Sequence, residues 1–322
     1  MGRSVAHLAP PFPGFSDPTA SVLLPESGRA RVARAVAPTP PKGLRANVDR
    51  GYLRRQSALM ALRTAAIDDA VREAAAPQVV ILGAGLDGRA WRMPELATSI
   101  VFEVDHPDSQ RDKRERIGAL TPTAREVRFL AVDFARDSLD AALEQAGHVV
   151  TERTMWVWEG VVMYLTPENV EATLRVIARR SAPGSRLSIT YAAPARVLQL
   201  IGLVVRLIGE PFRSAYTREA MAALLVRTGF RVLGDDSIPE LGAQRSPTLG
   251  EAAKVAPHLR IVTAERTAQR VEPPGFAPTA PAWRAVAAAS GYLLSNGASF
   301  HLVFAGGPRF GARPAGRLLE RR

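Results

Sequence analysis

Short apolar runs alternate with longer amphipathic stretches along most of the chain. Seven runs have the length and apolar content of buried strands: residues 78–84, 99–105, 126–133, 154–160, 185–191, 230–236 and 259–266. Strands that are apolar throughout are typical of a parallel sheet that helices cover on both faces. The pattern therefore predicts an α/β fold.

Helical periodicity fills the intervals between these runs. Residues 50–75 are the first convincing helix, because Leu59, Leu62 and Val71 recur at helical spacing. Further helix-like stretches are residues 107–120, 138–146, 167–180 and 217–228. Such alternation predicts a central seven-stranded, mostly parallel sheet with helices on both faces. Little helix-like sequence separates the last two strands, which predicts an antiparallel C-terminal strand pair.

Three segments fall outside this alternation. Residues 1–49 are rich in Pro, Gly and Ala and lack clear periodicity, so an irregular N-terminal arm is expected before a domain at residues 50–266. Within that domain, residues 192–216 form either a core helix or a lid insertion over an apolar acceptor. Residues 267–322 are Pro-rich at first and Arg- and Gly-rich at the end, and the role of this C-terminal extension is left open.

Composition narrows the class of protein. The chain has 322 residues, 47% of them hydrophobic, which is ample for a sizeable core. It has no cysteine, which excludes disulfides, thiolate catalysis and cysteine-bound zinc, and without paired His or Asp ligand spacing no metal is expected. The longest apolar stretch, residues 197–209, is too short to span a bilayer and contains Arg206. Since the first residues also lack a secretory signal, a cytoplasmic protein without a membrane partner is expected.

The net charge of +11 is carried almost entirely by arginine. Such a charge can attract nucleic acid or anionic lipid. However, the chain has no Lys- and Arg-rich run with interleaved aromatic residues, which is what nucleic-acid binding would favour. The charge is interpreted as a solvated arginine-rich surface, and no nucleic-acid partner is expected.

A glycine-rich stretch, VVILGAGLDGRAWRM, contains the end of the first predicted strand. Its Gly83, Gly85 and Gly88 have the G-x-G-x-x-G spacing of a dinucleotide-binding turn. An acid about 20 residues further on, Glu103 or Asp105, suits the ribose hydroxyls of a nucleotide. NAD and S-adenosylmethionine both contain an adenosine ribose, so the turn and the acid suit either ligand.

The charged residues of this turn help to separate the two ligands. A pyrophosphate favours uncharged backbone N–H groups at a helix N-terminus, and Asp87 would repel it. S-adenosylmethionine has no phosphate, and its ammonium and sulfonium are cationic. Asp87 and Arg89 therefore favour S-adenosylmethionine.

Five blocks follow one another in order: VVILGAGLDGRAWRM, VFEVDHP, LAVDF, WVWEGVVMYLT and SAPGSRL. Together they resemble the leucine carboxyl methyltransferase-like family, which includes polyketide O-methyltransferases. The resemblance implies a Rossmann-like class I methyltransferase fold and S-adenosyl-L-methionine as the cofactor. It also implies an O-methyltransferase that acts on a carboxylate or hydroxyl of a small molecule, such as a secondary metabolite.

The resemblance implies roles for single residues as well. The residues expected to bind the cofactor are Arg63, Gly83, Ala84, Gly85, Asp105, His106, Asp133, Phe134 and Glu159, although His106 replaces the apolar or small residue that is more usual in the family. Gly83 and Gly85 line the methionine moiety. Asp105 bonds the ribose hydroxyls, and Asp133 and Phe134 flank the adenine.

The amino-acid end of the cofactor is assigned to two charged residues. The resemblance places Glu159 near the ammonium or sulfonium, and Arg63 against a carboxylate, most simply that of the cofactor. A carboxylate in the apolar strand that precedes Glu159 is costly unless it is paired. An internal arginine partner for Glu159 and a surface role for Arg63 are the alternatives.

Two residues are candidates for catalysis. The family places a tyrosine beside the methyl-transfer site at the position of Tyr164, and His106 is a candidate general base at the edge of the cofactor. Packing for Tyr164 and a bystander role for His106 are the alternatives. A carboxylate acceptor is ionised at pH 7 and needs no base, whereas an aliphatic hydroxyl needs one. The scarcity of bases favours a carboxylate or an acidic phenol.

Two other functions stay open. An NAD(P)-dependent oxidoreductase would use the same glycine turn. A non-catalytic binding protein would combine a decayed methyltransferase fold with a basic surface, although Asp105, Asp133 and Glu159 are all retained. Neither the identity of the acceptor nor the oligomeric state follows from the sequence.

Overall fold

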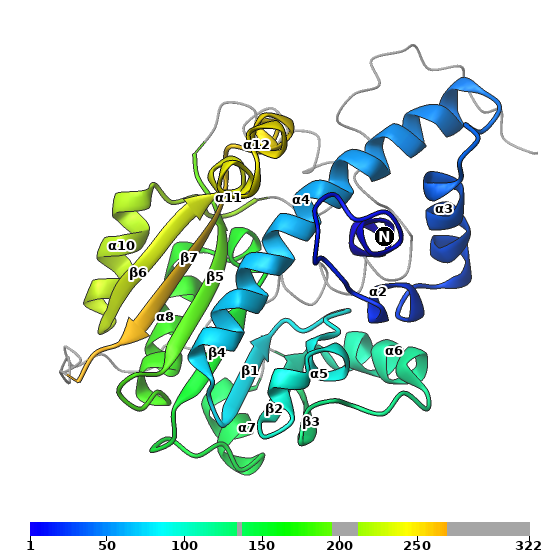
Figure 1. Ribbon diagram of the computed structural model, residues 1–322. Helices are drawn as coiled ribbons and strands as arrows, with labels where there is room; N and C mark the ends of the chain where they lie inside the picture. Colours follow the sequence, from blue (N-terminus) through cyan, green and yellow to red (C-terminus); the bar gives the residue numbers. More distant parts are fainter. Residues whose placement is uncertain (134–136, 195–211, 269–322) are drawn as a thin grey trace, which may run out of the picture.

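The structure, a computed structural model, describes residues 1–133, 137–194 and 212–268. A sheet of seven strands runs through it (Figure 1): β1 (Gln78–Leu82), β2 (Ile100–Asp105), β3 (Glu126–Ala131), β4 (Thr154–Trp158), β5 (Arg186–Ala192), β6 (Phe230–Ser237) and β7 (Leu259–Arg266). Their order is β3-β2-β1-β4-β5-β7-β6. β7 is antiparallel to β5 and β6, and the other pairs are parallel. The predicted sheet is confirmed.

The central strands are apolar because both faces of the sheet are covered. In β1, Val79 and Ile81 join the core on one face, and Val80 and Leu82 join the core on the other. All four side chains are buried. Each predicted strand coincides with an observed strand, and its ends differ by at most two residues.

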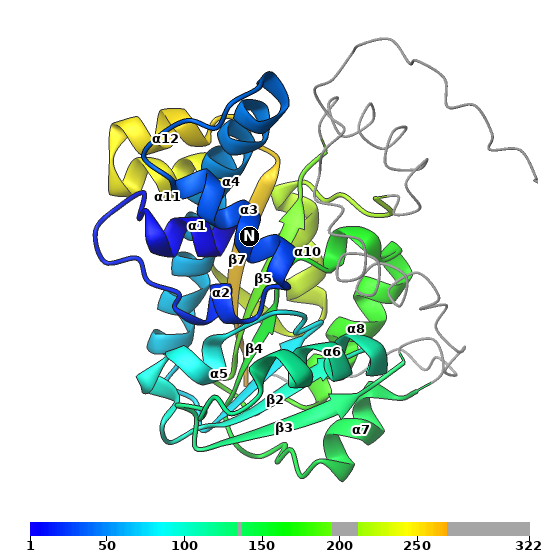
Figure 2. The same cartoon turned by 90° about the vertical axis from the view of Figure 1, so that its right-hand side faces the viewer.

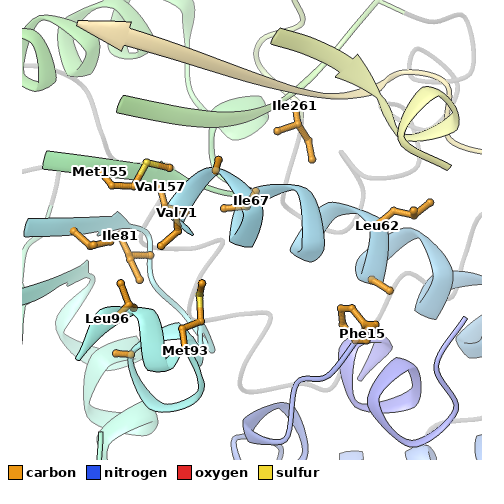
Figure 3. Close-up of a cluster of buried hydrophobic side chains, with 14 of the residues drawn as sticks. Phe15, Leu62, Ile67, Val71, Ile81, Met93, Leu96, Met155, Val157 and Ile261 are labelled. Atoms are coloured by element: carbon orange, nitrogen blue, oxygen red, sulfur yellow. The ribbon is translucent and has the colours of Figure 1, made fainter. Parts of the chain in front are cut away.

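Helices pack on the two faces in separate groups. One face is covered by α4 (Leu44–Ala74), α5 (Arg89–Arg92), α6 (Pro107–Ile117), α11 (Ile238–Arg245) and α12 (Pro247–Ala253). The other face is covered by α7 (Leu139–Gln145), α8 (Pro167–Arg179) and α10 (Arg218–Arg227). Short 3₁₀ turns are η1 (Pro94–Leu96) and η2 (Val162–Tyr164). Figure 3 shows Ile67 and Val71 of α4 near Met155 and Val157 of β4.

The first 49 residues are not an irregular arm. They form α1 (Gly2–Leu8), α2 (Thr19–Val22) and α3 (Glu26–Val36), and α4 begins within them (Figure 2). Their apolar side chains form a small core of their own with α4: Val5, Leu24, Val32, Ala35 and Leu53. Helices α1 and α2 have only seven and four residues, and α3 has few large apolar side chains, so tertiary packing stabilises them. That is why the sequence pattern missed them.

The last two strands are separated by two helices rather than by little helix. α11 and α12 approach closely, since a Cβ on Gly242 would lie 2.9 Å from the carbonyl oxygen of Leu249. Ser237 and Ser246 cap the two helices, and a proline is the second residue of α11 and the first residue of α12. Residues 195–211 of the predicted lid and residues 269–322 of the extension lie outside the described residues.

Candidate cofactor site

The glycine turn follows β1 and lies against the ends of β2 and β4. The backbone N–H groups of Gly83 and Ala84 both donate to the carbonyl oxygen of Val104, at 2.8 and 3.1 Å. Gly83 and Gly85 have positive φ angles of 66° and 44°, which glycine adopts without strain. A Cβ on Gly83 would also lie 2.5 Å from Cγ2 of Val161. The turn therefore requires glycine at its first position for close packing as well as for conformation.

Asp105 ends β2 directly beside this turn. Its Oδ2 accepts the backbone N–H of Gly85 at 2.5 Å, and its Oδ1 accepts the backbone N–H of His106 at 2.7 Å. The side chain is buried, and burial raises the pKa of Asp105 although these two bonds oppose the change. Carboxylate oxygens can accept further hydrogen bonds, so Asp105 can still receive ribose hydroxyls.

Glu103, the other acid proposed for the ribose, has a different partner. Its Oε2 lies 2.6 Å from the ammonium of Lys113, which in turn lies 5.1 Å from the centroid of the Trp91 ring. Burial raises the pKa of Glu103 to about 7 against the opposing effect of Lys113. Glu103 is thus part of a buried ion pair, and Asp105 is the acid that contacts the glycine turn.

Gly88, the third glycine, is required for a contact with the N-terminal helices. A Cβ on Gly88 would lie 1.8 Å from Oγ1 of Thr19 and 2.8 Å from its Cβ. A larger residue at this position would force Thr19 to shift, so the glycine is needed in this chain for a packing contact. The glycine permits Thr19, whose hydroxyl donates to Asp17, to lie against the turn.

Glu159 follows β4 and forms ion pairs with two arginines. Nε of Arg63 lies 2.7 Å from Oε1, and Nη1 of Arg89 lies 2.9 Å from Oε2. Burial alone would raise the pKa of Glu159, but the two guanidinium groups lower it well below its usual range. The internal arginine partner considered for Glu159 is present. Arg63 is on the inside of the site rather than on a solvated surface, with 23% of its side chain exposed.

Arg89 connects three parts of the molecule and is fully buried. Besides Glu159 it binds Asp68 of α4, with Nε 2.8 Å from Oδ1, and Asp87 of the glycine turn through Nη1. Asp87 also accepts the backbone N–H of Arg89 at 2.8 Å. The charge of Asp87 is therefore compensated, and the expected repulsion of a pyrophosphate by this residue is not supported.

The N-terminal helices are tied into the same cluster of charges. Arg92 binds Asp68 through two hydrogen bonds of 2.7 and 2.9 Å, and its Nε lies 3.5 Å from Asp17. Arg3 lies 3.3 Å from Asp17 and donates to the carbonyl oxygen of Leu86 at 2.5 Å. Sequence reasoning missed these partners. The one indication of this cluster in the sequence was Asp68, an acidic residue next to Ile67 on the apolar face of α4.

Three further predicted residues, His106, Tyr164 and Asp133, have contacts close to them in the chain or in the fold. His106 caps α6, with Nδ1 accepting the backbone N–H of Asp108 at 3.3 Å. The ring of Tyr164 stacks on Phe212 with centroids 5.7 Å apart. Asp133 follows β3 and its backbone N–H donates to Asp137. Phe134 lies outside the described residues.

The described residues contain neither a metal-binding cluster nor a membrane-spanning helix. Among the described residues, no three His, Cys, Asp or Glu side chains are grouped so that they could hold a metal ion. Every helix of residues 1–133, 137–194 and 212–268 is too short or too polar to cross a membrane.

Comparison with known proteins identifies the family. Residues 2–178 match the leucine carboxyl methyltransferase family. A protein of Mycolicibacterium gilvum that bears the name S-adenosyl-L-methionine-dependent methyltransferase is 35% identical over 254 residues, 77% of this chain and 80% of its own length. A relative from Mycolicibacterium smegmatis is 45% identical over 136 residues, 40% of this chain and 44% of its own. The chain belongs to the leucine carboxyl methyltransferase family. It is a methyltransferase that depends on S-adenosyl-L-methionine.

Solved structures agree on the fold. A duf574 family protein from Streptomyces avermitilis has a TM-score of 0.53 at 14% identity, covering 82% of this chain and 96% of that one. A protein of Bordetella parapertussis has a TM-score of 0.50 at 17% identity, covering 83% and 93%. With the strand order above, they confirm the class I methyltransferase fold. Family membership also decides against an NAD(P)-dependent oxidoreductase.

Proposed function

We propose that the protein transfers a methyl group to an oxygen atom of a small molecule, either a carboxylate or an acidic hydroxyl. The observation that carries the position of the reaction is the ion pair of Arg63 with Glu159 beside the glycine turn. Its two opposite charges match the carboxylate and the ammonium of an α-amino acid. The methionine end of S-adenosylmethionine is such a group.

The charged and polar groups of the site fit this cofactor. Arg63 would bind the carboxylate of the cofactor and Glu159 its ammonium. The amino-acid end of the cofactor would then lie between Arg63 and Glu159 and replace their direct ion pair. Asp105, held by two backbone N–H groups, would accept the ribose hydroxyls. Gly83, Ala84 and Gly85 would line the chain between these ends. Asp133 and Phe134 are proposed to flank the adenine, with His106 at its edge.

Holding both ends of the cofactor is what the chain contributes to the reaction. When bound, the cofactor supplies an activated methyl group with a good leaving group. Arg63, Glu159 and Asp105 restrict its position, which lowers the entropy cost of bringing the acceptor into line. None of these residues is required to remove a proton from the acceptor.

The nature of the acceptor is inferred from the scarcity of bases. His106 caps α6 through Nδ1, and Tyr164 is stacked on Phe212. Neither is placed as an evident general base, which favours an acceptor that is ionised at pH 7. A cytoplasmic location and a small-molecule substrate from secondary metabolism stay expectations of the sequence.

The proposal is tested with S-adenosylmethionine labelled in its methyl group and a panel of carboxylic acids, phenols and amines. We expect label in an oxygen acceptor. Mild alkali then separates the two acceptor classes, because a methyl ester releases labelled methanol and a methyl ether does not. Transfer to nitrogen or carbon alone would contradict the proposal.

A further inference from the structure

We propose that Arg89 is a positioning residue for cofactor binding: it holds one oxygen of Glu159 so that the other can receive the cofactor ammonium. This inference rests on the proposed function of the site. Arg89, the last residue of the LDGR sequence in the glycine turn, has this role without contacting the cofactor.

The two oxygens of Glu159 are divided between two unequal arginines. Arg63 binds Oε1, and 23% of its side chain is exposed. Arg89 binds Oε2, and its side chain is fully buried. When Arg63 turns to a ligand carboxylate, Oε1 becomes available to an ammonium while Oε2 keeps its guanidinium partner. Glu159 therefore stays charged and oriented during the exchange.

Arg89 is suited to this role because it is itself held from two further sides. Asp68 comes from α4, Asp87 from the glycine turn and Glu159 from the loop after β4. A planar guanidinium presents its donors in fixed directions, which a lysine ammonium does not. Three carboxylates around one guanidinium leave Arg89 little freedom to follow a movement of Arg63.

Arg92 provides a matched control. It lies three residues further along the same helix, its side chain is 4% exposed, and it binds Asp68 and Asp17. It belongs to the same charge cluster, but its ion pairs are with these two aspartates. A purely structural effect of disturbing the cluster should therefore appear at Arg92 as well as at Arg89.

Two ligands separate positioning from folding. S-adenosylhomocysteine has the amino-acid end, and 5′-methylthioadenosine has the same nucleoside and thioether without it. Calorimetry with the full chain should show that Arg89→Lys weakens the binding of S-adenosylhomocysteine by about 10- to 100-fold. This is the effect of losing one hydrogen bond to a charged group. Binding of 5′-methylthioadenosine should change less than about threefold, and Arg92→Lys should spare both ligands.

If Arg89→Lys lowered the affinity for both ligands equally, or for neither of them, the inference would be overturned. Should that variant fail to fold, Asp68→Asn loosens Arg89 from α4, and the same selective loss is expected at smaller size. An equal loss of both ligands there would be as damaging. If the unaltered chain does not bind S-adenosylhomocysteine, the proposed function fails instead, so the two failures are distinguishable.

Discussion

The ends of β2 and β4 lie at the same edge of the sheet, and each has a buried carboxylate with a different environment. Asp105 is held by two backbone N–H groups, and burial raises its pKa. Glu159 is held by two guanidinium groups, which lower its pKa against the effect of burial. The first environment suits neutral hydroxyl partners, and the second keeps a negative charge ready for a cation.

Asp105 and Glu159 also differ in which parts of the chain position them. Asp105 is positioned by its immediate neighbour and by the turn that follows the adjacent strand. Glu159 depends on Arg63 of α4 and on Arg89 of α5, and Arg89 is held in turn by Asp68 of α4. Changes at the β4 end should therefore affect the amino-acid part of the cofactor alone, and changes at the β2 end should affect every nucleoside ligand.

The largest effect is expected from Glu159→Gln. The variant removes the only proposed partner of the ammonium and leaves two arginines without their shared carboxylate. S-adenosylhomocysteine should bind about 100-fold more weakly, or about 3 kcal/mol, and 5′-methylthioadenosine should be unaffected. Calorimetry with both ligands measures this, with urea unfolding as the control for stability. Unchanged affinity for S-adenosylhomocysteine would remove Glu159 from the site.

Gly88→Ala tests whether the N-terminal helices pack on the glycine turn. Since the added Cβ would overlap Oγ1 of Thr19, the free energy of unfolding should fall by about 2 kcal/mol. Denaturant unfolding measures the loss. Adding Thr19→Ala removes the overlapping oxygen and should restore part of it. A single variant as stable as the original chain would show that α2 does not pack on the turn in solution.

Asp105→Asn should have a smaller effect on binding, and it should not discriminate between ligands. It exchanges a charged acceptor of the ribose hydroxyls for a neutral one, worth about 1.5 kcal/mol or roughly tenfold in affinity. Both S-adenosylhomocysteine and 5′-methylthioadenosine should weaken to the same degree. A loss confined to S-adenosylhomocysteine would place Asp105 at the amino-acid end instead.

The smallest effect is expected from pH. The pKa of Asp105 is raised, so its ionised form is lost at a higher pH than for an ordinary aspartate, and both ligands should weaken as the pH falls. The pKa of Glu159 is lowered, so it stays ionised over the same range. The affinity ratio of the two ligands should therefore be constant between about pH 5 and 8. If acidification weakened S-adenosylhomocysteine more than 5′-methylthioadenosine, the proposed difference between Asp105 and Glu159 would be contradicted.

Local patterns predicted the sheet, the glycine turn and Asp105, because apolar runs and a turn between strand and helix are set by neighbouring residues. Helices α1 and α2 are very short and α3 has few large apolar residues, and all three were missed. The partners of Glu159 could not be paired from sequence, since Arg63, Asp68 and Arg89 come together only when α4 packs on the sheet. The same holds for Gly88, whose need for glycine depends on Thr19.

The most direct test is a crystal structure with S-adenosylhomocysteine bound. The account predicts the ligand ammonium within hydrogen-bond distance of Glu159, its carboxylate on Arg63 and its ribose hydroxyls on Asp105, with Arg89 still bonded to Glu159. A ligand that binds elsewhere, or that leaves the ion pair of Arg63 with Glu159 intact, would contradict it.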